Sequence, residues 1–352
     1  MATSMQPQAP SPRQSHATEA RPTPQRIFSS LFAYRLTAAL RGAIDLDLFT
    51  AIGEGDRTAE SLALRVQGSV RGVRILCDFL AIEGLLEKKG SEYHLAPDSA
   101  AFLDRRSPMY LGSAAGFLAN PDLMHYFNDL AGTVRNGGAA LADETVQPDN
   151  PLWVDFARYM AGIAGFGAEM VAQLLTRLNI PVNSVLDIAA GHGMYGITLA
   201  RHNPHAKITA LDWKNVLAVA ADNAQRMGVS DRFHPLPGSA FEVEPGTGYD
   251  VVLLTNFLHH FEPPKNESLM RKIHEALAPG GRLVIVDFVP NPDRVTPPEA
   301  AAFSLTMLAT THNGDAYTFE EYRSMLRNSG FQAADLHPLP PTVQQVIIAR
   351  RD

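Results

Sequence analysis

Two adjacent histidines follow an apolar run in residues 253–264, LLTNFLHHFEPP. Such runs are typical of buried parallel strands, so His259 and His260 are expected just past the end of one. An imidazole there can pack in the core, bind a metal or take a proton from a substrate. Adjacent side chains point in different directions and no second histidine follows at helical spacing, which disfavours a metal site with Glu262 and Asp287. Packing and proton transfer remain as alternatives for His259, and His260 is expected to be a structural or surface ring.

A second chemical signal is the glycine-containing loop VLDIAAGHGMYG at residues 185–196, between a predicted strand and a predicted helix. Gly191 and Gly193 let a ligand approach the backbone, and the start of the helix offers unpaired N–H groups. Asp212 ends the next predicted strand about 20 residues further on, where a carboxylate can accept hydrogen bonds from ribose hydroxyls. These residues predict a nucleoside at the carboxyl ends of the strands.

The residues before the first glycine indicate which nucleoside this is. Dinucleotide loops place glycine directly after the strand in a GxGxxG pattern, whereas here residues 188–190 separate Asp187 from Gly191. This spacing argues against a nicotinamide dehydrogenase. A carboxylate at Asp187 suits a cation better than a diphosphate, and S-adenosylmethionine carries an ammonium and a sulfonium. Asp187 can also bond N–H groups of its own loop, and the two roles are compatible.

The elements that must hold these residues alternate from about residue 180 onward. The apolar runs SVLDI, KITALD, FHPLP, YDVVLLT and RLVIVDFV are separated by helical patterns. This alternation predicts a parallel sheet with helices on both faces. Two further runs, FQAADLHPLP and TVQQVIIAR, follow each other without a helix. The predicted fold is therefore α/β, a Rossmann-like doubly wound sheet finished by a C-terminal antiparallel hairpin.

Residues 26–150 are expected to form a separate, mostly helical domain. Four residues lie on one face of its first predicted helix: Ile27, Leu31, Tyr34 and Ala38. Gly42 is expected to end that helix, and Thr58 and Ser69 are expected to cap two more. A hairpin around residues 89–91 follows, which completes the order of a winged helix.

The winged-helix order raises the question of a DNA-binding regulator. The helix after Ser69 is apolar around most of its circumference, with only Arg71 and Arg74 near its start, and the formal net charge of the chain is -7. Both features disfavour nucleic acid as a partner. A helix that is apolar all round is buried in its own core or against a second subunit. We therefore expect a dimerisation domain.

Composition places further limits on the chain. It has 352 residues, of which 45% are hydrophobic, enough for about two domains. A single cysteine, Cys77, excludes a disulfide framework and favours a reducing compartment, so a cytoplasmic protein is expected. The apolar runs are shorter than the ~20 residues that a bilayer span needs, so no membrane partner is expected. The proline-rich residues 1–25 are expected to form a flexible tail.

Several of these motifs together resemble one known family. VLDIAAGHG, ALDW, LTNFLHHF, ALAPGGRLVIVDF and the final VIIARRD resemble class I S-adenosylmethionine-dependent methyltransferases. With the winged-helix domain in front, residues 26 to about 350 are similar to small-molecule O-methyltransferases of the caffeate and hydroxyindole type, which include bacterial pigment and antibiotic enzymes of secondary metabolism. The resemblance implies a homodimer, a cofactor-binding domain at residues 151–352, and an aromatic or polyketide-like acceptor with a hydroxyl.

The resemblance also implies which residues bind S-adenosylmethionine, the cofactor that becomes S-adenosylhomocysteine. Asp187, Gly191 and Gly193 match the family's cofactor loop, and Asp212 matches its ribose-binding acid. Ser239 replaces an acid that bonds the adenine amine in the family, so its hydroxyl or a stacked Phe241 is expected to substitute. The implied contacts beyond the loop are Tyr159, Trp213, Ser239, Ala240, Phe241 and Asn256.

Catalytic roles follow from the same comparison. His259 matches the family's base and Asp287 matches a carboxylate that steadies it, in keeping with a phenol that titrates near ~10 and needs help to lose its proton. A second family carboxylate lies in a Gly-x-Glu-Arg-Thr segment. Here NGDAYTF, residues 313–319, has Ala316 at that place and Asp315 beside it. The missing carboxylate leaves methylation of carbon, or another use of the cofactor, as alternatives.

Candidates for the acceptor pocket come from two apolar segments, around residues 116–127 and 300–314, and from residues 153–162, which resemble the linker helix that reaches the cofactor in the family, with Tyr159 and Met160 nearest. Apolar side chains at helical spacing usually form core, but an aromatic acceptor needs an apolar concave wall. The candidate acceptor contacts are Phe117, Met124, Met160, Phe303 and Met307.

Overall fold

The computed structural model describes residues 22–139 and 150–352. Its longer part contains one seven-stranded sheet in the order β5-β4-β3-β6-β7-β9-β8. The strands are β3 Ser184–Ile188, β4 Lys207–Asp212, β5 Phe233–Pro237, β6 Tyr249–Thr255, β7 Leu277–Asp287, β8 Ala334–Pro338 and β9 Gln345–Arg350. β3 to β7 are parallel, whereas β9 runs antiparallel to β7 and β8. The predicted sheet and terminal hairpin are therefore confirmed.

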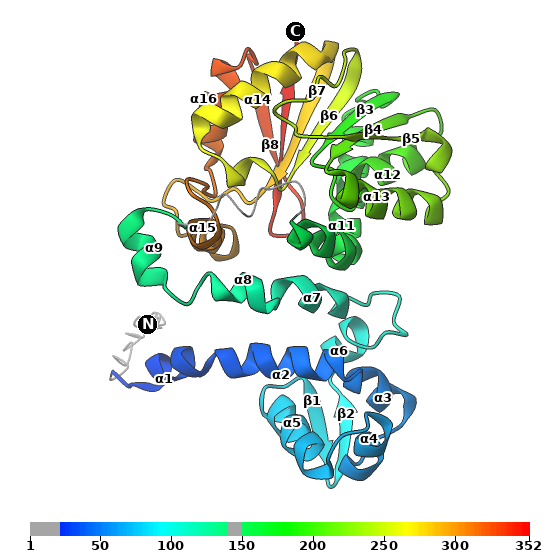
Figure 1. Cartoon of the computed structure of the whole chain (residues 1–352), viewed down its shortest axis with the longest axis vertical. Coiled ribbons are helices and arrows are strands. Elements are labelled where there is room, and N and C mark those ends of the chain that lie inside the picture. Colours follow the sequence, from blue (N-terminus) through cyan, green and yellow to red (C-terminus); the bar gives the residue numbers. More distant parts are fainter. Residues whose placement is uncertain (1–21, 140–149) are drawn as a thin grey trace, which may run out of the picture.

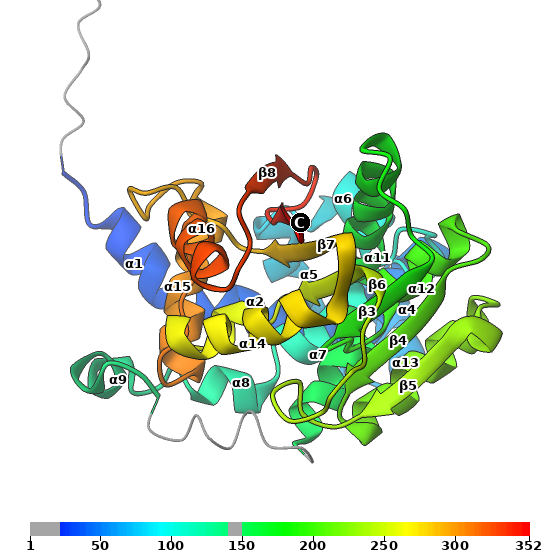
Figure 2. The same ribbon diagram turned by 90° about the horizontal axis from the view of Figure 1, so that it is seen from above.

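Helices cover both faces of this sheet (Figures 1 and 2). One core contains side chains of α11 (Pro151–Arg177), α12 (Met194–His202) and α13 (Lys214–Arg226). The other contains side chains of α14 (Pro263–Ala276) and α16 (Phe319–Asn328). Successive strand residues alternate between the two cores, as Val251 and Val252 of β6 do, because side chains of a strand point alternately to opposite faces.

Chain order reverses between β3 and β6, which creates a switch point in the sheet. From β3 the chain proceeds outward through β4 and β5, and it then returns to β6 on the other side of β3. Ligands of open α/β sheets bind at such points, beyond the carboxyl ends of the strands. In Figure 1 these ends face the helical part of the molecule, since the chain terminus marked C follows the antiparallel β9 at the opposite edge.

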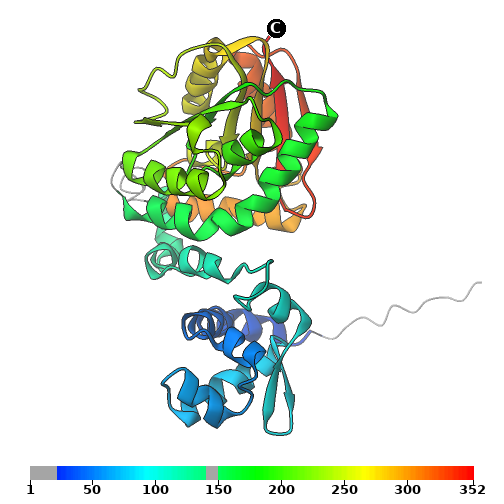
Figure 3. The ribbon, with the colours of Figure 1, turned by 90° about the vertical axis from the view of Figure 1, so that its right-hand side faces the viewer.

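The helical domain lies beyond this edge along the long axis of the molecule (Figure 3). It contains α1 Gln25–Phe32, α2 Tyr34–Asp45, α3 Leu48–Glu54, α4 Ala59–Arg65, α5 Val70–Ile82, β1 Leu86–Lys89, β2 Glu92–Leu95 and α6 Pro97–Phe102. The side chains of Thr58 and Ser69 cap α4 and α5, and β1 pairs with β2 around Gly90. The predicted order of helices and hairpin is confirmed. The short helices α7 Ala115–Leu118, α8 Pro121–His125 and α9 Leu130–Asn136 lie between this domain and the sheet.

Two predictions for the helical domain were wrong. The first predicted helix is interrupted at Ala33, where the bond from the Ala33 N–H to the Ser30 carbonyl spans three residues and divides α1 from α2. Gly42 does not end a helix, because α2 continues to Asp45 and the chain turns at Asp47, which has a φ of 54°. A glycine is tolerated inside a helix when the following residues keep the pattern.

Some helices of the helical domain have apolar side chains that are exposed in the single chain. In α5 the side chains of Val73, Cys77 and Leu80 are buried, but Ile75 and Ile82 are 43% and 79% exposed. The apolar residues of α1 are also exposed, and no residue of this helix is buried. The helical domain of the single chain therefore buries only part of the apolar surface of α5.

Three remaining predictions concern single segments. Most of the predicted tail, residues 1–21, lies outside the described residues, and Gln25 already belongs to α1. The helix predicted at residues 300–314 is α15, Pro298–Thr310. Within residues 22–139 and 150–352, none of the helices has the length and apolar character that crossing a bilayer requires.

Candidate active site

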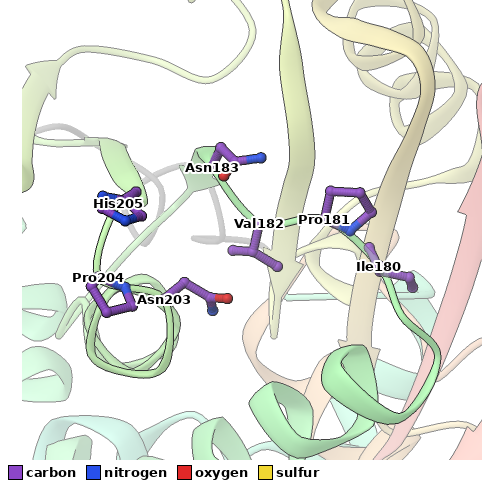
Figure 4. A pocket seen from close by; sticks show the side chains of 7 residues that line it. All are labelled: Ile180, Pro181, Val182, Asn183, Asn203, Pro204 and His205. Carbon is purple, nitrogen blue, oxygen red and sulfur yellow. The ribbon is translucent and has the colours of Figure 1, made fainter.

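Four polar residues follow or end neighbouring strands at the carboxyl edge of the sheet. Asp187 lies in β3, Asp212 ends β4, Asn256 follows β6 and Asp287 ends β7. Strand register brings these ends together, because Ile188 pairs with Leu211 and Leu254, and Thr255 pairs with Val286. A hollow of about 320 Å³ lies at the opposite edge, between residues 180–183 and 203–205 (Figure 4), and holds none of the predicted site residues.

The predicted base and its carboxylate form a buried pair. His259 lies in the turn Leu258–His260 after β6 and is 3% exposed. Its Nδ1 is 2.6 Å from Oδ1 of Asp287. An ionised carboxylate only accepts hydrogen bonds, so Nδ1 carries the proton and Nε2 keeps its lone pair. The pair therefore presents one basic nitrogen, which is what a general base requires.

Asp287 is held by three donors. Its Oδ1 also accepts the Phe288 N–H at 2.8 Å, and its Oδ2 accepts the hydroxyl of Tyr322 at 2.9 Å. Tyr322 lies on α16 and is 0% exposed. Sequence reasoning missed Tyr322, because its spacing with Phe319 and Leu326 reads as a core stripe of an amphipathic helix.

The loop before α16 fixes the backbone of the base. The N–H of Asp315 donates to the carbonyl of His259 at 3.0 Å, and a Cβ on Gly314 would lie 2.3 Å from that carbonyl oxygen. Ala316 is fully buried, and its methyl group offers no hydrogen bond in place of the family's glutamate. Asp315 does not replace that glutamate, because its carboxylate pairs with Arg294 at 3.0 Å.

His260 proved to be a half-buried ring within an aromatic series, in agreement with the structural role expected for it. Its centroid is 4.4 Å from that of His259 and 5.3 Å from that of Trp153. Burial, helped by the neighbouring His259, holds the pKa of His260 well below its ordinary value. His260 is therefore neutral at physiological pH and adds no charge beside the base.

The glycine loop after β3 surrounds a carboxylate with an unused acceptor. Asp187 is 1% exposed, and its Oδ2 accepts the Gly196 N–H at 3.1 Å, so the expected bonding within the loop region is present. Its Oδ1 has no partner among the described residues. Burial raises the pKa of Asp187 to about 8. A cationic ligand fits this site, because it would supply the missing partner and favour the charged carboxylate.

The two glycines of the loop have the backbone conformation that this cradle needs. Gly191 and Gly193 have φ angles of 55° and 73°, in the left-handed region that favours glycine. A Cβ on Gly191 would come within 3.3 Å of the Phe156 ring. Because residue 191 has no side chain, the loop backbone lies close to this ring.

Asp212 lies against the same loop. Its Oδ2 accepts the Gly191 N–H at 2.8 Å and its Oδ1 accepts the Trp213 N–H at 2.6 Å. Burial raises the pKa of Asp212 to about 6. Each oxygen has a second lone pair, so the carboxylate can still accept from ligand hydroxyls. Trp213 thus contributes its backbone N–H to the positioning of Asp212.

The segment after β5 is joined to Asp212 through the Gly238 N–H, which donates to the Asp212 carbonyl at 3.0 Å. Ser239 uses its hydroxyl to accept the Phe241 N–H at 3.3 Å, and Ala240 is buried. The Phe241 ring packs edge-on against Phe261 at 4.9 Å. Phe241 is therefore part of a rigid aromatic cluster beside the strand ends.

Asn256 differs from the other predicted cofactor contacts. Its φ of 53° is unusual for a residue other than glycine, and its N–H donates to the Val286 carbonyl at 2.9 Å. Its side-chain oxygen accepts a hydrogen bond from the Gln344 amide in the loop between β8 and β9. The structure thus pairs this side chain with the terminal hairpin.

A series of aromatic rings connects the glycine loop with the base. Phe156 of α11 stacks on His192 at 5.7 Å, and Trp153 lies 6.1 Å from Phe156 and 5.3 Å from His260. Burial lowers the pKa of His192 to about 4, so this ring is also neutral at pH 7. None of Trp153, Phe156 and His192 was predicted. The position of His192 between the two glycines was the available signal.

The predicted acceptor contacts divide into two groups. Phe303 lies 4.8 Å from the His259 ring and stacks on Phe288 at 3.9 Å, and Phe117 lies 5.2 Å from Phe156. The ring of Tyr159, predicted as a cofactor contact, covers Gly116 next to Phe117. Of the other three predicted acceptor contacts, Met307 is buried, Met160 is half-buried and Met124 is 41% exposed.

Metal-ligating side chains do not converge in the described part of the chain. Among residues 22–139 and 150–352, no group of three or more His, Cys, Asp or Glu side chains is placed to hold a metal ion.

Comparison with known proteins places this geometry in one family. Residues 142–332 match the model of the O-methyltransferase domain, and residues 28–105 match that of the O-methyltransferase dimerisation domain. A solved structure from Nostoc punctiforme that is assigned to the O-methyltransferases is 50% identical, has a TM-score of 0.90, and is matched over 94% of this chain and 99% of that one.

Two curated relatives come from Streptomyces. The 3-hydroxy-5-methyl-1-naphthoate 3-O-methyltransferase of Streptomyces sahachiroi is 28% identical over 84% of this chain and 85% of its own length. The tetracenomycin polyketide synthesis 8-O-methyl transferase of Streptomyces glaucescens is 28% identical over 88% of this chain and 91% of its own. With the two matched domains, the activity and the S-adenosylmethionine dependence predicted from the sequence are confirmed. The chain belongs to the O-methyltransferase family and carries the dimerisation domain of that family.

Proposed function

We propose that the chain transfers a methyl group from S-adenosylmethionine to a hydroxyl of an aromatic or polyketide-like small molecule, with His259 as general base. The observation that carries this proposal is the buried pair of His259 and Asp287, joined at 2.6 Å with Nε2 of the imidazole left as an acceptor. The series of rings from His260 to His192 runs from this pair to the glycine loop, which supports assigning both to one site.

The cofactor is assigned to the loop after β3 and the end of β4. Asp187 would face the cationic part of the cofactor, since its Oδ1 is buried without a partner among the described residues. Gly191 would let the loop backbone lie beside the cofactor, Gly193 would maintain the turn through its φ of 73°, and Asp212 would accept from the ribose hydroxyls. When bound, the sulfonium supplies an electrophilic methyl group. The segment with Ser239, Ala240 and Phe241 is assigned to the adenine side, because it adjoins Asp212.

His259 would remove the acceptor's proton. A phenol titrates near ~10, so at neutral pH few molecules carry the nucleophilic phenolate. Nε2 would accept this proton as the acceptor oxygen forms its bond to the methyl carbon, and Asp287 would stabilise the resulting imidazolium through Nδ1. General bases of this kind contribute about 10²–10⁴-fold to rate.

The acceptor is assigned to the aromatic wall. Phe303 lies 4.8 Å from the ring of the base, and Trp153 and Phe156 continue the series of rings beyond His260. The rings of His192 and His260 are held neutral by burial. Such a wall favours a flat, apolar molecule. The two Streptomyces relatives named above act on a hydroxynaphthoate and in tetracenomycin polyketide synthesis, which supports an aromatic acceptor.

The helical domain is assigned to a homodimer interface. Ile27, Leu31 and Tyr34 are 63%, 64% and 61% exposed in the single chain, and Ile82 of α5 is 79% exposed. Large apolar patches of this kind mark interaction sites. The match of residues 28–105 to a dimerisation domain supports a second copy as the partner.

The proposal is tested in two steps. Calorimetric titration with S-adenosylhomocysteine should show binding to the wild-type protein and to His259→Ala with similar affinity. A panel of hydroxylated naphthoates and other phenols, assayed with methyl-labelled S-adenosylmethionine, should then yield labelled methyl ethers with the wild-type protein alone. A fully active His259→Ala variant would remove the residue from its assigned role, and label on carbon would overturn O-methylation.

A further inference from the structure

We infer that Tyr322 is a positioning residue for the base, because its buried hydroxyl holds the carboxylate of Asp287 that orients His259. This inference rests on the proposed role of His259. It concerns how this chain supports the base where the second carboxylate expected from the resemblance is replaced by Ala316.

The geometry of Asp287 assigns a separate task to each oxygen. Oδ1 receives the His259 Nδ1–H at 2.6 Å and the Phe288 N–H at 2.8 Å. Among the hydrogen bonds found in the described part of the chain, the Tyr322 hydroxyl at 2.9 Å is the one made to Oδ2. Without this donor, Oδ2 would be a buried acceptor with no partner among the described residues, and the negative charge of Asp287 would be balanced from the Oδ1 side alone.

The helix that carries Tyr322 is fixed at its start. Thr318 and Glu321 form a capping box, and Glu321 also pairs with Arg294 at 2.6 Å. Arg294 holds Asp315 as well, whose N–H binds the carbonyl of His259. The phenol and the backbone of the base are therefore anchored to one network, and a supporting shell of this kind maintains the geometry of a catalytic group.

The phenol differs in charge from the carboxylate expected in this region. Burial, followed by the neighbouring Asp287, raises the pKa of Tyr322 far above its ordinary value, so the hydroxyl stays protonated and donates. Ala316, in the loop before α16, is fully buried and apolar. The imidazolium formed during turnover would thus be stabilised by one carboxylate, Asp287. The hydrogen bond from Tyr322 stabilises part of the negative charge of that carboxylate.

The other titratable groups around the pair are accounted for. On its own turn His259 faces His260, which burial keeps neutral. From α12, Tyr195 faces Asp287 with its pKa raised above the ordinary range by burial, and the loop before α16 contributes Tyr317, whose pKa is raised by burial in the same way. Asp315 and Glu321 of that region are both paired with Arg294.

Removal of the hydroxyl has a defined electrostatic effect. In Tyr322→Phe the negative charge of Asp287 is no longer shared with a donor on Oδ2, so the carboxylate attracts the imidazolium more strongly. The protonated form of His259 should therefore be favoured in this variant. The neutral, basic form would then appear only at higher pH.

The test measures this shift without an acceptor. Protein labelled with ¹³C at Cε1 of histidine is titrated by NMR from pH 5 to 9 with S-adenosylhomocysteine, and His259→Gln identifies the signal of His259. We expect the midpoint of this signal to move to higher pH in Tyr322→Phe. The matched control is Tyr317→Phe, because the Tyr317 ring packs 5.8 Å from Tyr322 but its hydroxyl binds the Phe261 carbonyl. This control should leave the His259 titration unchanged.

A second variant protects the test against misfolding of Tyr322→Phe. Site-specific 3-fluorotyrosine at position 322 keeps the ring and makes the hydroxyl a stronger donor, so the His259 titration should move down. Equal titrations of the wild-type protein and both Tyr322 variants would overturn the inference and leave Tyr322 as a packing residue. An active His259→Ala variant would instead overturn the proposed function, and the two failures are thereby distinguished.

Discussion

Cofactor binding should be coupled to the ionisation of Asp187. In the free protein burial raises the pKa of Asp187 to about 8, so at pH 6 only about 1% of molecules carry the carboxylate. A cationic ligand binds the ionised form, and the apparent affinity follows its population. Affinity for S-adenosylhomocysteine, which keeps the ammonium, should therefore rise about fiftyfold from pH 6 to pH 8. Close to one proton should be released per ligand near pH 7.

Calorimetry in buffers of different ionisation enthalpy measures both quantities. In Asp187→Asn the amide oxygen can still accept the Gly196 N–H, but the steep pH dependence should disappear. Asp212, with a pKa raised to about 6, would leave a shallow dependence near pH 6 in both proteins. Asp250→Asn is the matched control, because Asp250 accepts the N–H groups of Asn183 and Ser184 at the opposite edge of the sheet. A wild-type affinity that is flat between pH 6 and 8, or a slope retained in Asp187→Asn, would refute this reasoning.

Two further variants test the loop at the base and the helical domain. Gly314→Ala should displace the His259 carbonyl, which lies 2.3 Å from the added Cβ, and turnover should fall at least tenfold. The control is Gly228→Ala, where φ is 71° and no atom lies within 4 Å of the added Cβ. This control should lower the free energy of unfolding by only about 1–2 kcal/mol and leave turnover unchanged. The double variant with Ile27→Ser and Leu31→Ser should convert a dimer into a monomer in light scattering, because it removes the apolar face of α1 from the interface; a wild-type monomer would contradict that assignment.

Most of the sheet could be predicted from the sequence because its signals are local. The strand around Asp187 is a short apolar run followed a few residues later by Gly191 and Gly193, and α13 ends where Gly228 takes a φ of 71°. The helical domain was less predictable at Ala33 and Gly42. Nothing in the local sequence pattern predicts the interruption at Ala33 between α1 and α2. At Gly42 the helix continues, because a glycine inside a helix is tolerated when tertiary packing stabilises the helix.

Site residues could be predicted from the sequence where they lie directly at the end of a predicted strand. His259 and Asp287 each follow an apolar run, and parallel strands bring their ends together. Tyr322 and Phe156 could not be found in this way, since each lies on a helix far from the strand ends in sequence and looks like an ordinary core residue. Their roles depend on which helix packs over the site, a property of the fold as a whole.

The length of α11 has a mechanical consequence. This 27-residue helix begins with Trp153 and Phe156 in the aromatic wall and ends with Val171 and Leu175 embedded in the core behind the sheet. Its early turns also contact the segment between the helical domain and the sheet, where the Ser113 hydroxyl donates to the Tyr159 carbonyl at 3.3 Å. A continuous helix is stiff along its axis, so a displacement of that segment would move these two rings together, because they lie farther from the core than the contact at Tyr159.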